Sequence, residues 1–306
     1  MKKDEKRRLI DNKGLRLDGR KADELRPITL KVGILERANG SAYIEHGNNK
    51  ILVAVYGPRE IHPKHLALPN KANVRCEYRL ATFSVNERKS PAPRRREHEL
   101  SKIIQEALES AIFTERYPRV AIDIYIQVLD ADGGTRCASV TAASLALADA
   151  GLPLSGMVSA VAVGKVDGQI VLDLSDIEDK EGEGDLPIAV NNQDGSLTLL
   201  QLDGDFSVED FEKALDLGTE ACKTIYEMQK QVLLQKYEDI RSSIKAAEAE
   251  GEEEIDEELG EPESLRIADE DEENGEEEGD LEFVDIEVDE DEDEENGEDE
   301  DYFSDQ

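Results

Sequence analysis

The sequence of 306 residues has no tryptophan, only three cysteines and no long apolar run. Indole stacking is therefore unavailable for ligand recognition, and no membrane-spanning helix is expected, because a span needs about 20 apolar residues. Cys76, Cys137 and Cys222 form no Cys-x-x-Cys pair. Isolated cysteines argue against a disulfide framework and are typical of a reducing cytoplasm. The four histidines are not spaced like zinc ligands, so we expect them in loops or on the surface.

Acidic residues are abundant but unevenly placed. The net charge is −37, and residues 248–306 hold 34 acidic residues and one basic residue, which leaves −4 for residues 1–247. We expect residues 248–306 to be a disordered acidic tail, because so little apolar surface cannot offset chain entropy. The tail either keeps the protein in solution or folds onto a basic partner through its segment DLEFVDIEVDEDE. Residues 1–13 form a basic extension that lacks the apolar stretch of a secretory signal.

The rest of the chain alternates between strand and helix patterns. Alternating or continuous apolar runs predict strands within residues 28–57, 72–82, 120–129 and 157–200. Apolar residues at helical spacing predict helices that begin near residues 94, 133 and 208. This order predicts a mixed α/β fold whose sheets include antiparallel pairs, rather than a doubly wound parallel sheet.

A first candidate site is PAPRRREHELSK, residues 91–102, which places three arginines at the start of a helix. A guanidinium group matches phosphate oxygens two bonds at a time, and a helix N-terminus adds free N–H groups. Cations are unfavourable there unless an anion is present. The alternative interpretation is a solvated turn in which the arginines pair with Glu97 and Glu99.

A second candidate is DADGGTRCAS, residues 130–139, where two glycines, Thr135 and Arg136 open the next helix. Glycines let an anion approach the backbone, but the Gly-Lys-Ser/Thr end of a Walker motif is absent. An ordinary glycine-rich helix start is the alternative.

The third candidate is DLSDIEDKEGEGDLPIAV, residues 173–190, where acidic residues lie between two apolar strands. Clustered carboxylates indicate raised pKa values, a metal site, or simply a solvated hairpin loop, which is the simpler interpretation. Together the three segments hold what chemistry on a phosphodiester requires: two anion sites and an acidic cluster.

These segments, with RLDGRKADELRP near the N-terminus, resemble the RNase PH family, and most closely its catalytic ring subunits of the archaeal exosome. The resemblance covers residues 14–240 and implies a catalytic domain of two β-α-β-type halves with mixed sheets. It implies a hexameric ring around a channel for single-stranded RNA, built as a trimer of heterodimers with a non-catalytic relative and covered by RNA-binding cap subunits. The implied reaction is reversible phosphorolysis from the RNA 3′ end in the cytoplasm, with inorganic phosphate as co-substrate.

The resemblance also implies residue roles. Phosphate binding is implied for Arg96, Gly134, Thr135, Arg136 and Ser139, and RNA binding for Lys64, His65 and Arg95. The two acidic catalytic positions fall on Asp179 and Asp185, which would act as general acid or share a Mg²⁺ ion. Arg94 is one arginine more than the family pattern needs, so we expect it only to support the others.

Two alternatives stay open at this point. The chain could be a homohexameric RNase PH that trims tRNA 3′ ends, or a non-catalytic ring scaffold that binds RNA. Scaffold relatives lose the acidic pair or the arginines, whereas this sequence retains both, which favours catalysis.

Overall fold

The computed structural model describes residues 8–259. Most of residues 1–13 and the tail residues 260–306 therefore lie outside the described residues. The body of the chain ends at Glu253, and of the following unit the structure describes only the end of one helix. None of the helices within residues 8–259 is both long and apolar enough to cross a membrane.

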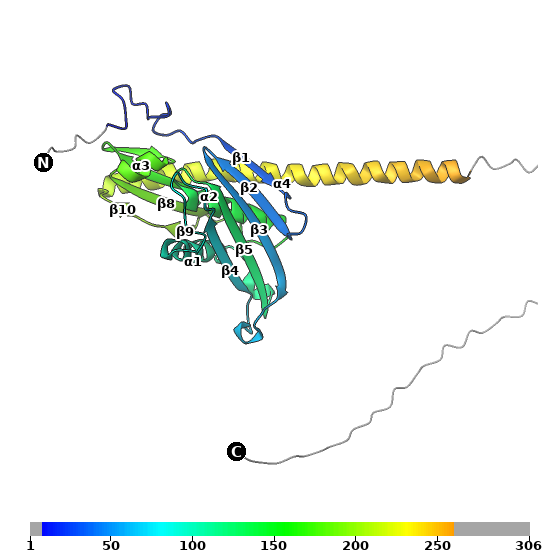
Figure 1. Ribbon diagram of the computed structural model, residues 1–306. Coiled ribbons are helices and arrows are strands. Elements are labelled where there is room, and N and C mark those ends of the chain that lie inside the picture. The colour runs from blue at the N-terminus through cyan, green and yellow to red at the C-terminus, as the bar shows by residue number, and fades with distance from the viewer. Residues whose placement is uncertain (1–7, 260–306) are drawn as a thin grey trace, which may run out of the picture. The chain divides into compact units, whose positions relative to one another are not determined.

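The first sheet has five strands in the order β1-β2-β3-β5-β4 (Figure 1). Their bounds are β1 Ile28–Val32, β2 Gly40–His46, β3 Asn49–Glu60, β4 Asn73–Leu80 and β5 Val120–Asp130. Neighbours are antiparallel except for β4 and β5, which run parallel. This arrangement confirms the predicted mixed sheet with antiparallel pairs.

The second sheet is antiparallel and carries the acidic segment. It contains β6 Val158–Val166, β7 Gln169–Leu172, β8 Gly184–Asn191, β9 Leu197–Leu200 and the short β10 Asp203–Gly204. β8 lies between β6 and β10 and also pairs with β9. The predicted strands of residues 157–200 are confirmed, while β10 was not predicted because two residues carry no periodic signal.

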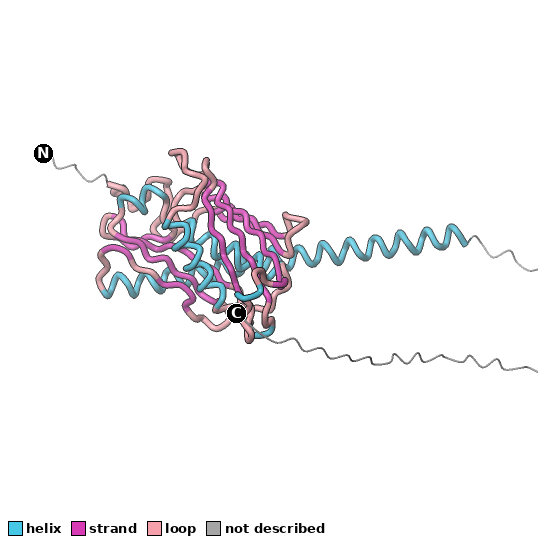
Figure 2. Tube along the Cα trace, turned by 60° about the horizontal axis from the view of Figure 1, so that its bottom comes forward, coloured by secondary structure: helices cyan, strands magenta, loops and turns pink. Residues whose placement is uncertain are grey.

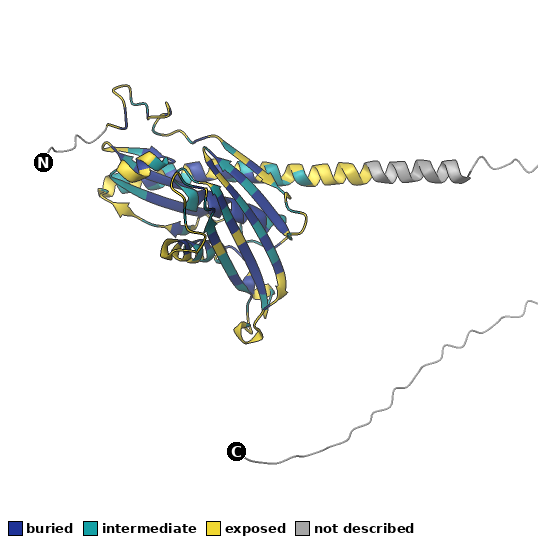
Figure 3. Cartoon of the chain, viewed as in Figure 1, coloured by how far each residue is buried: buried dark blue, intermediate teal, exposed yellow. Residues whose placement is uncertain are grey.

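Helix α2, Thr135–Asp149, contacts strands of both sheets. Its residues from Cys137 to Leu147 are all buried, and seven of these eleven are alanine, serine or threonine, which lets two sheets approach one helix closely. Figure 1 labels α2 among the strands, Figure 2 shows helices and strands packed together, and Figure 3 shows buried residues along both sheets. The first turn of α2 is therefore held where the two sheets meet.

The other helices cover the sheets. Helix α1, Arg95–Glu109, packs on β4 and β9, and α4, Val208–Leu259, packs its apolar residues on β6 and β8. Gly218 of α4 lies so close to the sheet that a Cβ there would meet Ile188 at 2.6 Å. Short 3₁₀ helices span Lys64–Leu66 and Thr114–Arg116.

Two features differ from the sequence-based expectations. The acidic segment is not only a solvated loop, because it contains the short helix α3, Asp176–Glu181. In addition, α4 continues to Leu259, so residues 248–259 are helical although we expected the tail to be disordered from residue 248. Alanine and glutamate have high helix propensity, and extending an existing helix avoids the cost of nucleation.

Candidate active site

A cavity of about 440 Å³ lies where the first turns of α1, α2 and α3 meet the start of β8. Its lining is strongly charged. The basic side chains are Lys89, Arg94, Arg96, Arg136 and Lys180, and the acidic ones are Asp176, Asp179 and Asp185. Three segments far apart in the sequence thus contribute to one cavity.

At the start of α1 the three consecutive arginines separate. Arg94 and Arg96 line the cavity, whereas the Arg95 side chain is 92% exposed and pairs with Glu99 at 2.7 Å. Arg94 thus takes a place in the site that we did not expect, and Arg95 lies outside the cavity. Buried Glu97 fixes the turn by accepting hydrogen bonds from the backbone N–H of Arg94 (2.8 Å) and of Leu80 (3.1 Å). A helix start places adjacent residues on different sides, which the sequence run alone does not show.

The turn before α2 is built from two left-handed glycines, Gly133 (φ +68°) and Gly134 (φ +67°). A Cβ at Gly133 would lie 2.6 Å from the backbone of Ser175, so this position has no room for a side chain. Thr135 follows, and its hydroxyl accepts a 2.9 Å hydrogen bond from the hydroxyl of Tyr78. Burial raises the pKa of Tyr78 to about 12, so the phenol keeps its proton and orients Thr135.

Ser139 does not reach this cavity. It is fully buried within α2, is not part of the lining, and its hydroxyl has no hydrogen-bond partner among the described residues. Lys64 and His65 lie in the exposed 3₁₀ helix between β3 and β4, where Lys64 pairs with Glu60 at 2.9 Å. The loop that carries them is at the far end of the first sheet (Figure 1). Of the expected site residues, those that line the cavity are Arg96, Gly134, Thr135, Arg136, Asp179 and Asp185, and those outside it are Arg95, Ser139, Lys64 and His65.

Asp185 lies at the start of β8, with Arg136 Nη2 at 3.7 Å from its Oδ2 atom. Burial raises the pKa of Asp185, and the negative charge of Asp179 raises it further, while Arg136 opposes the shift. Arg136 also donates a hydrogen bond to Gln201. A half-buried carboxyl with a raised pKa beside a guanidinium group can hold a proton and release it to a nearby oxygen.

Metal binding by the protein alone is not indicated. Within residues 8–259, no three His, Cys, Asp or Glu side chains are grouped closely enough to hold a metal ion. Mg²⁺ commonly uses only one or two carboxylates together with substrate phosphates. Asp179 and Asp185 fit that second arrangement, in which the substrate supplies the remaining ligands.

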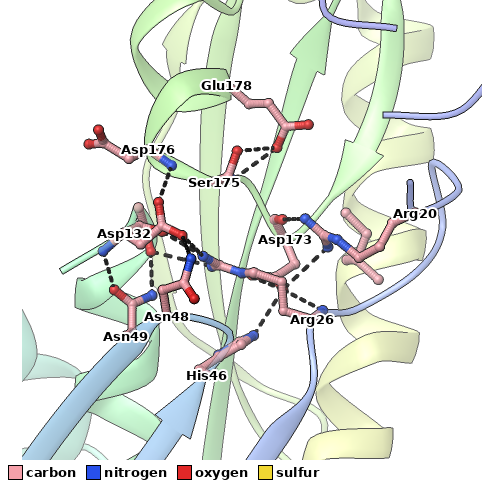
Figure 4. A network of polar contacts seen from close by, with 12 residues as sticks. Arg20, Arg26, His46, Asn48, Asn49, Asp132, Asp173, Ser175, Asp176 and Glu178 are labelled. Atoms are coloured by element: carbon pink, nitrogen blue, oxygen red, sulfur yellow. Dashed lines mark hydrogen bonds and ion pairs between the residues drawn. The ribbon is translucent and has the colours of Figure 1, made fainter. Parts of the chain in front are cut away.

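A buried polar network beside the Gly133–Gly134 turn was not predicted from the sequence (Figure 4). Its centre is Asp173, which accepts hydrogen bonds from Arg26 Nη2 (2.6 Å) and pairs with His46 Nε2 (3.0 Å). We expected His46 in a loop or on the surface, but it is 3% exposed. Arg16 and Glu178 form a second buried ion pair at 2.5 Å. The signal that could have found the arginines of this network is RLDGRKADELRP, which contains Arg16, Arg20 and Arg26.

Comparisons with known proteins match the part of the chain that contains the cavity. Residues 24–153 match domain 1 and residues 156–221 match domain 2 of the 3′ exoribonuclease family. The exosome complex component Rrp41 of Methanopyrus kandleri is 55% identical over 75% of this chain and 96% of its own length. Rrp41 of Pyrococcus furiosus is 54% identical over 81% of this chain and 99% of its own length.

Solved structures show the same fold. Rice Rrp46 superposes with a TM-score of 0.64 and 26% identity, covering 71% of this chain and all of that one. A chain of the Archaeoglobus fulgidus exosome with RNA bound to the active site gives a TM-score of 0.61 and 23% identity, covering 70% of this chain and 92% of that chain. This second likeness is evidence for the fold alone.

Proposed function

Because this chain belongs to the 3′ exoribonuclease family, we propose that it is the catalytic ring subunit of an exosome, shortening RNA from the 3′ end by phosphorolysis. Phosphate attacks the last phosphodiester, and RNA(n) plus phosphate gives RNA(n−1) plus a nucleoside 5′-diphosphate. The bond energy is conserved in the diphosphate, so the reaction is reversible and adds 3′ tails when diphosphates exceed phosphate. The observation that carries the proposal is the common cavity of Arg96, Arg136 and Asp185.

The difficulty of this reaction is bringing one anion against another. Inorganic phosphate is already anionic at neutral pH, so no strong base is needed. In our proposal Arg96 and Arg136 neutralise the phosphate, and the turn of Gly134 and Thr135 orients it with backbone N–H groups. Arg94 lies beside them and adds a further positive charge. Ser139, which is buried away from the cavity, would contribute only by packing.

The leaving ribose 3′-oxygen needs a proton, and we assign that role to Asp185. Its raised pKa keeps more of the carboxyl protonated, and Asp179 supports this by like charge. In the alternative, Asp179 and Asp185 as carboxylates would hold Mg²⁺, which would stabilise the negative charge on the leaving oxygen in place of the proton.

RNA reaches this site from the channel of the ring. We propose that Arg95, Lys64 and His65 bind its backbone, which their exposure outside the cavity permits. Binding through phosphates should tolerate any sequence and weaken with salt. The proposed partners are single-stranded RNA, a non-catalytic relative with which the chain alternates as a trimer of heterodimers, and RNA-binding cap subunits. Identity of 52–55% to exosome components favours this assembly over a homohexameric RNase PH.

A cytoplasmic location is supported by the thiols. Cys76, Cys137 and Cys222 are free. Burial raises the pKa of all three thiols to about 12, so they stay protonated and unreactive.

The experiment that tests the function is Asp185→Asn in the chain assembled with its ring partner. Release of nucleoside diphosphates from an oligoribonucleotide should fall about 100-fold or more, as for loss of a general acid. RNA affinity, measured by fluorescence anisotropy, should stay the same. The control is Asp194→Asn at an exposed loop position, which should leave turnover unchanged.

Near-normal turnover in Asp185→Asn would remove the role given to that residue. If the wild-type assembly releases no diphosphates with phosphate present, the scaffold alternative holds. A lone chain whose mass is that of a hexamer would instead favour the homohexameric enzyme.

A further inference from the structure

Among the described residues, no backbone hydrogen bond between Asp132 and Thr135 closes the left-handed Gly133–Gly134 turn. The carbonyl groups of Asp132 and Gly133 are both bound by one buried side chain, that of Arg26. Arg26 Nη1 donates to the carbonyl of Asp132 at 2.5 Å, and Arg26 Nη2 donates to the carbonyl of Gly133 at 3.3 Å. Asn49, fully buried, donates a second hydrogen bond of 2.6 Å to the Gly133 carbonyl.

These contacts decide which way the turn faces. In a planar trans peptide the carbonyl and the following N–H point in opposite directions. With the carbonyls of Asp132 and Gly133 directed at Arg26, the N–H groups of Gly133 and Gly134 are directed to the other side. Both glycines line the charged cavity, so the N–H groups are available there for an anion.

The Arg26 side chain is itself fixed by Asp173. The carboxylate accepts hydrogen bonds from the backbone N–H (2.8 Å), Nε (2.9 Å) and Nη2 (2.6 Å) of Arg26. Arg26 and Asp173 side chains are 6% and 2% exposed, so water does not compete for these bonds. A guanidinium group can bind a carboxylate and two carbonyls at once because it presents five donors in a rigid plane, which lysine cannot do.

The same network also reaches α3. The backbone N–H of Asp176 donates to Asp132 at 3.3 Å, and the Asp173 carbonyl is bound by Arg16, which pairs with Glu178 of α3. One buried set of ion pairs and hydrogen bonds therefore holds both the Gly133–Gly134 turn and α3, the helix that carries Asp179 (Figure 4). Arg16, Arg26, Asp173 and Glu178 are not among the residues that line the cavity.

We propose that Arg26, held by Asp173, is a positioning residue that aims the N–H groups of the Gly133–Gly134 turn at phosphate. This inference rests on the proposed function and specifies how one half of its site is built. The matched control is Arg20, which also contacts Asp173, through its carbonyl at 3.1 Å and its carboxylate at 3.5 Å. In the described residues Arg20 makes no hydrogen bond to the turn, its other partners being Asp18 and Glu24.

The test compares Arg26→Lys with Arg20→Lys in the ring assembly. Arg26→Lys should raise the KM for phosphate about 10-fold, a common effect of losing the partner that orients a ligand-binding group. The KM for RNA should stay within about twofold. Arg20→Lys should leave both constants unchanged. A general loss of folding would change the KM for phosphate and the KM for RNA together. Only a selective rise of the phosphate KM in Arg26→Lys therefore supports the positioning role.

A second measurement does not depend on activity. Hydrogen–deuterium exchange of the peptide that covers residues 130–139 should be faster in Arg26→Lys than in Arg20→Lys, and inorganic phosphate should slow it in the wild type but not in Arg26→Lys. Equal exchange in the two variants, or an unchanged phosphate KM in Arg26→Lys, would overturn the inference. If phosphate slows exchange in the wild type but no diphosphate is released, the proposed reaction fails while the positioning role stands.

Discussion

Replacing Asp173 by asparagine should destabilise the protein strongly. The Asp173 carboxylate is 2% exposed and neutralises Arg26, which is 6% exposed, while His46 lies at 3.0 Å. Asparagine keeps the size of the side chain but removes the charge, so buried Arg26 loses its closest counter-ion and keeps only the more distant carboxylate of Asp132, at 3.9 Å. Breaking a buried ion pair in this way costs about 3–5 kcal/mol of unfolding free energy, which for a folded body of this size lowers Tm by about 6 to 20 °C.

The control variant is Asp130→Asn. Asp130 pairs with Lys50 at 3.7 Å, but the two side chains are 52% and 47% exposed. A solvated pair of this kind contributes about 0–1 kcal/mol, so the Tm should change little. Urea unfolding and calorimetry of the two variants beside the wild type would measure the difference. A loss below about 1 kcal/mol for Asp173→Asn would refute the reasoning that the buried charge of Arg26 depends on Asp173.

The pH dependence of this difference has a definite sign. Burial alone would raise the pKa of Asp173, but His46 and Arg26 outweigh it and hold that pKa well below its usual range. A carboxyl whose pKa is depressed in the folded state stabilises the protein above its unfolded pKa, and this stabilisation is lost as pH falls. The gap between the wild type and Asp173→Asn should therefore stay constant from neutral pH down to about 4 and narrow only below it.

Three further predictions concern the cavity. Arg136→Ala should raise the KM for phosphate about 10- to 100-fold and the KM for RNA much less, because charged hydrogen bonds to phosphate are lost; equal changes in steady-state assays would remove Arg136 from the phosphate site. Asp179→Asn should lower the pKa of Asp185, so the decline of kcat with rising pH should begin at a lower pH. The control Asp176→Asn should leave the pH profile of kcat unchanged. An unchanged pH profile in Asp179→Asn would contradict the effect of the Asp179 charge on Asp185. Tyr78→Phe removes the 2.9 Å hydrogen bond to Thr135 and should raise the phosphate KM about fivefold, with Tyr125→Phe on the exposed sheet face as the unaffected control.

Much of the architecture could be read from local patterns. Alternating runs such as ITLKVGI, and the apolar spacing from Leu100 to Ile112, predicted β1 and α1 because one buried face imposes its period on the sequence. The short α3 was missed because six residues hold less than two turns, and its acidic composition resembles that of a solvated loop. Its Ser175 and Glu178 form a capping box, which was the available signal.

By itself, the sequence determined the family, the mixed α/β order and the three charged segments, because each depends on residues that are neighbours in the chain. Only the tertiary structure decided that Arg94 and Arg96 face the cavity while Arg95 faces solvent, and that Ser139 is buried away from it. It also decided that Asp173 shares one buried network with Arg26 and His46, which precede it in the chain by 147 and 127 residues. Side-chain direction and burial follow from how two sheets close on α2, and no local pattern of residues encodes that packing.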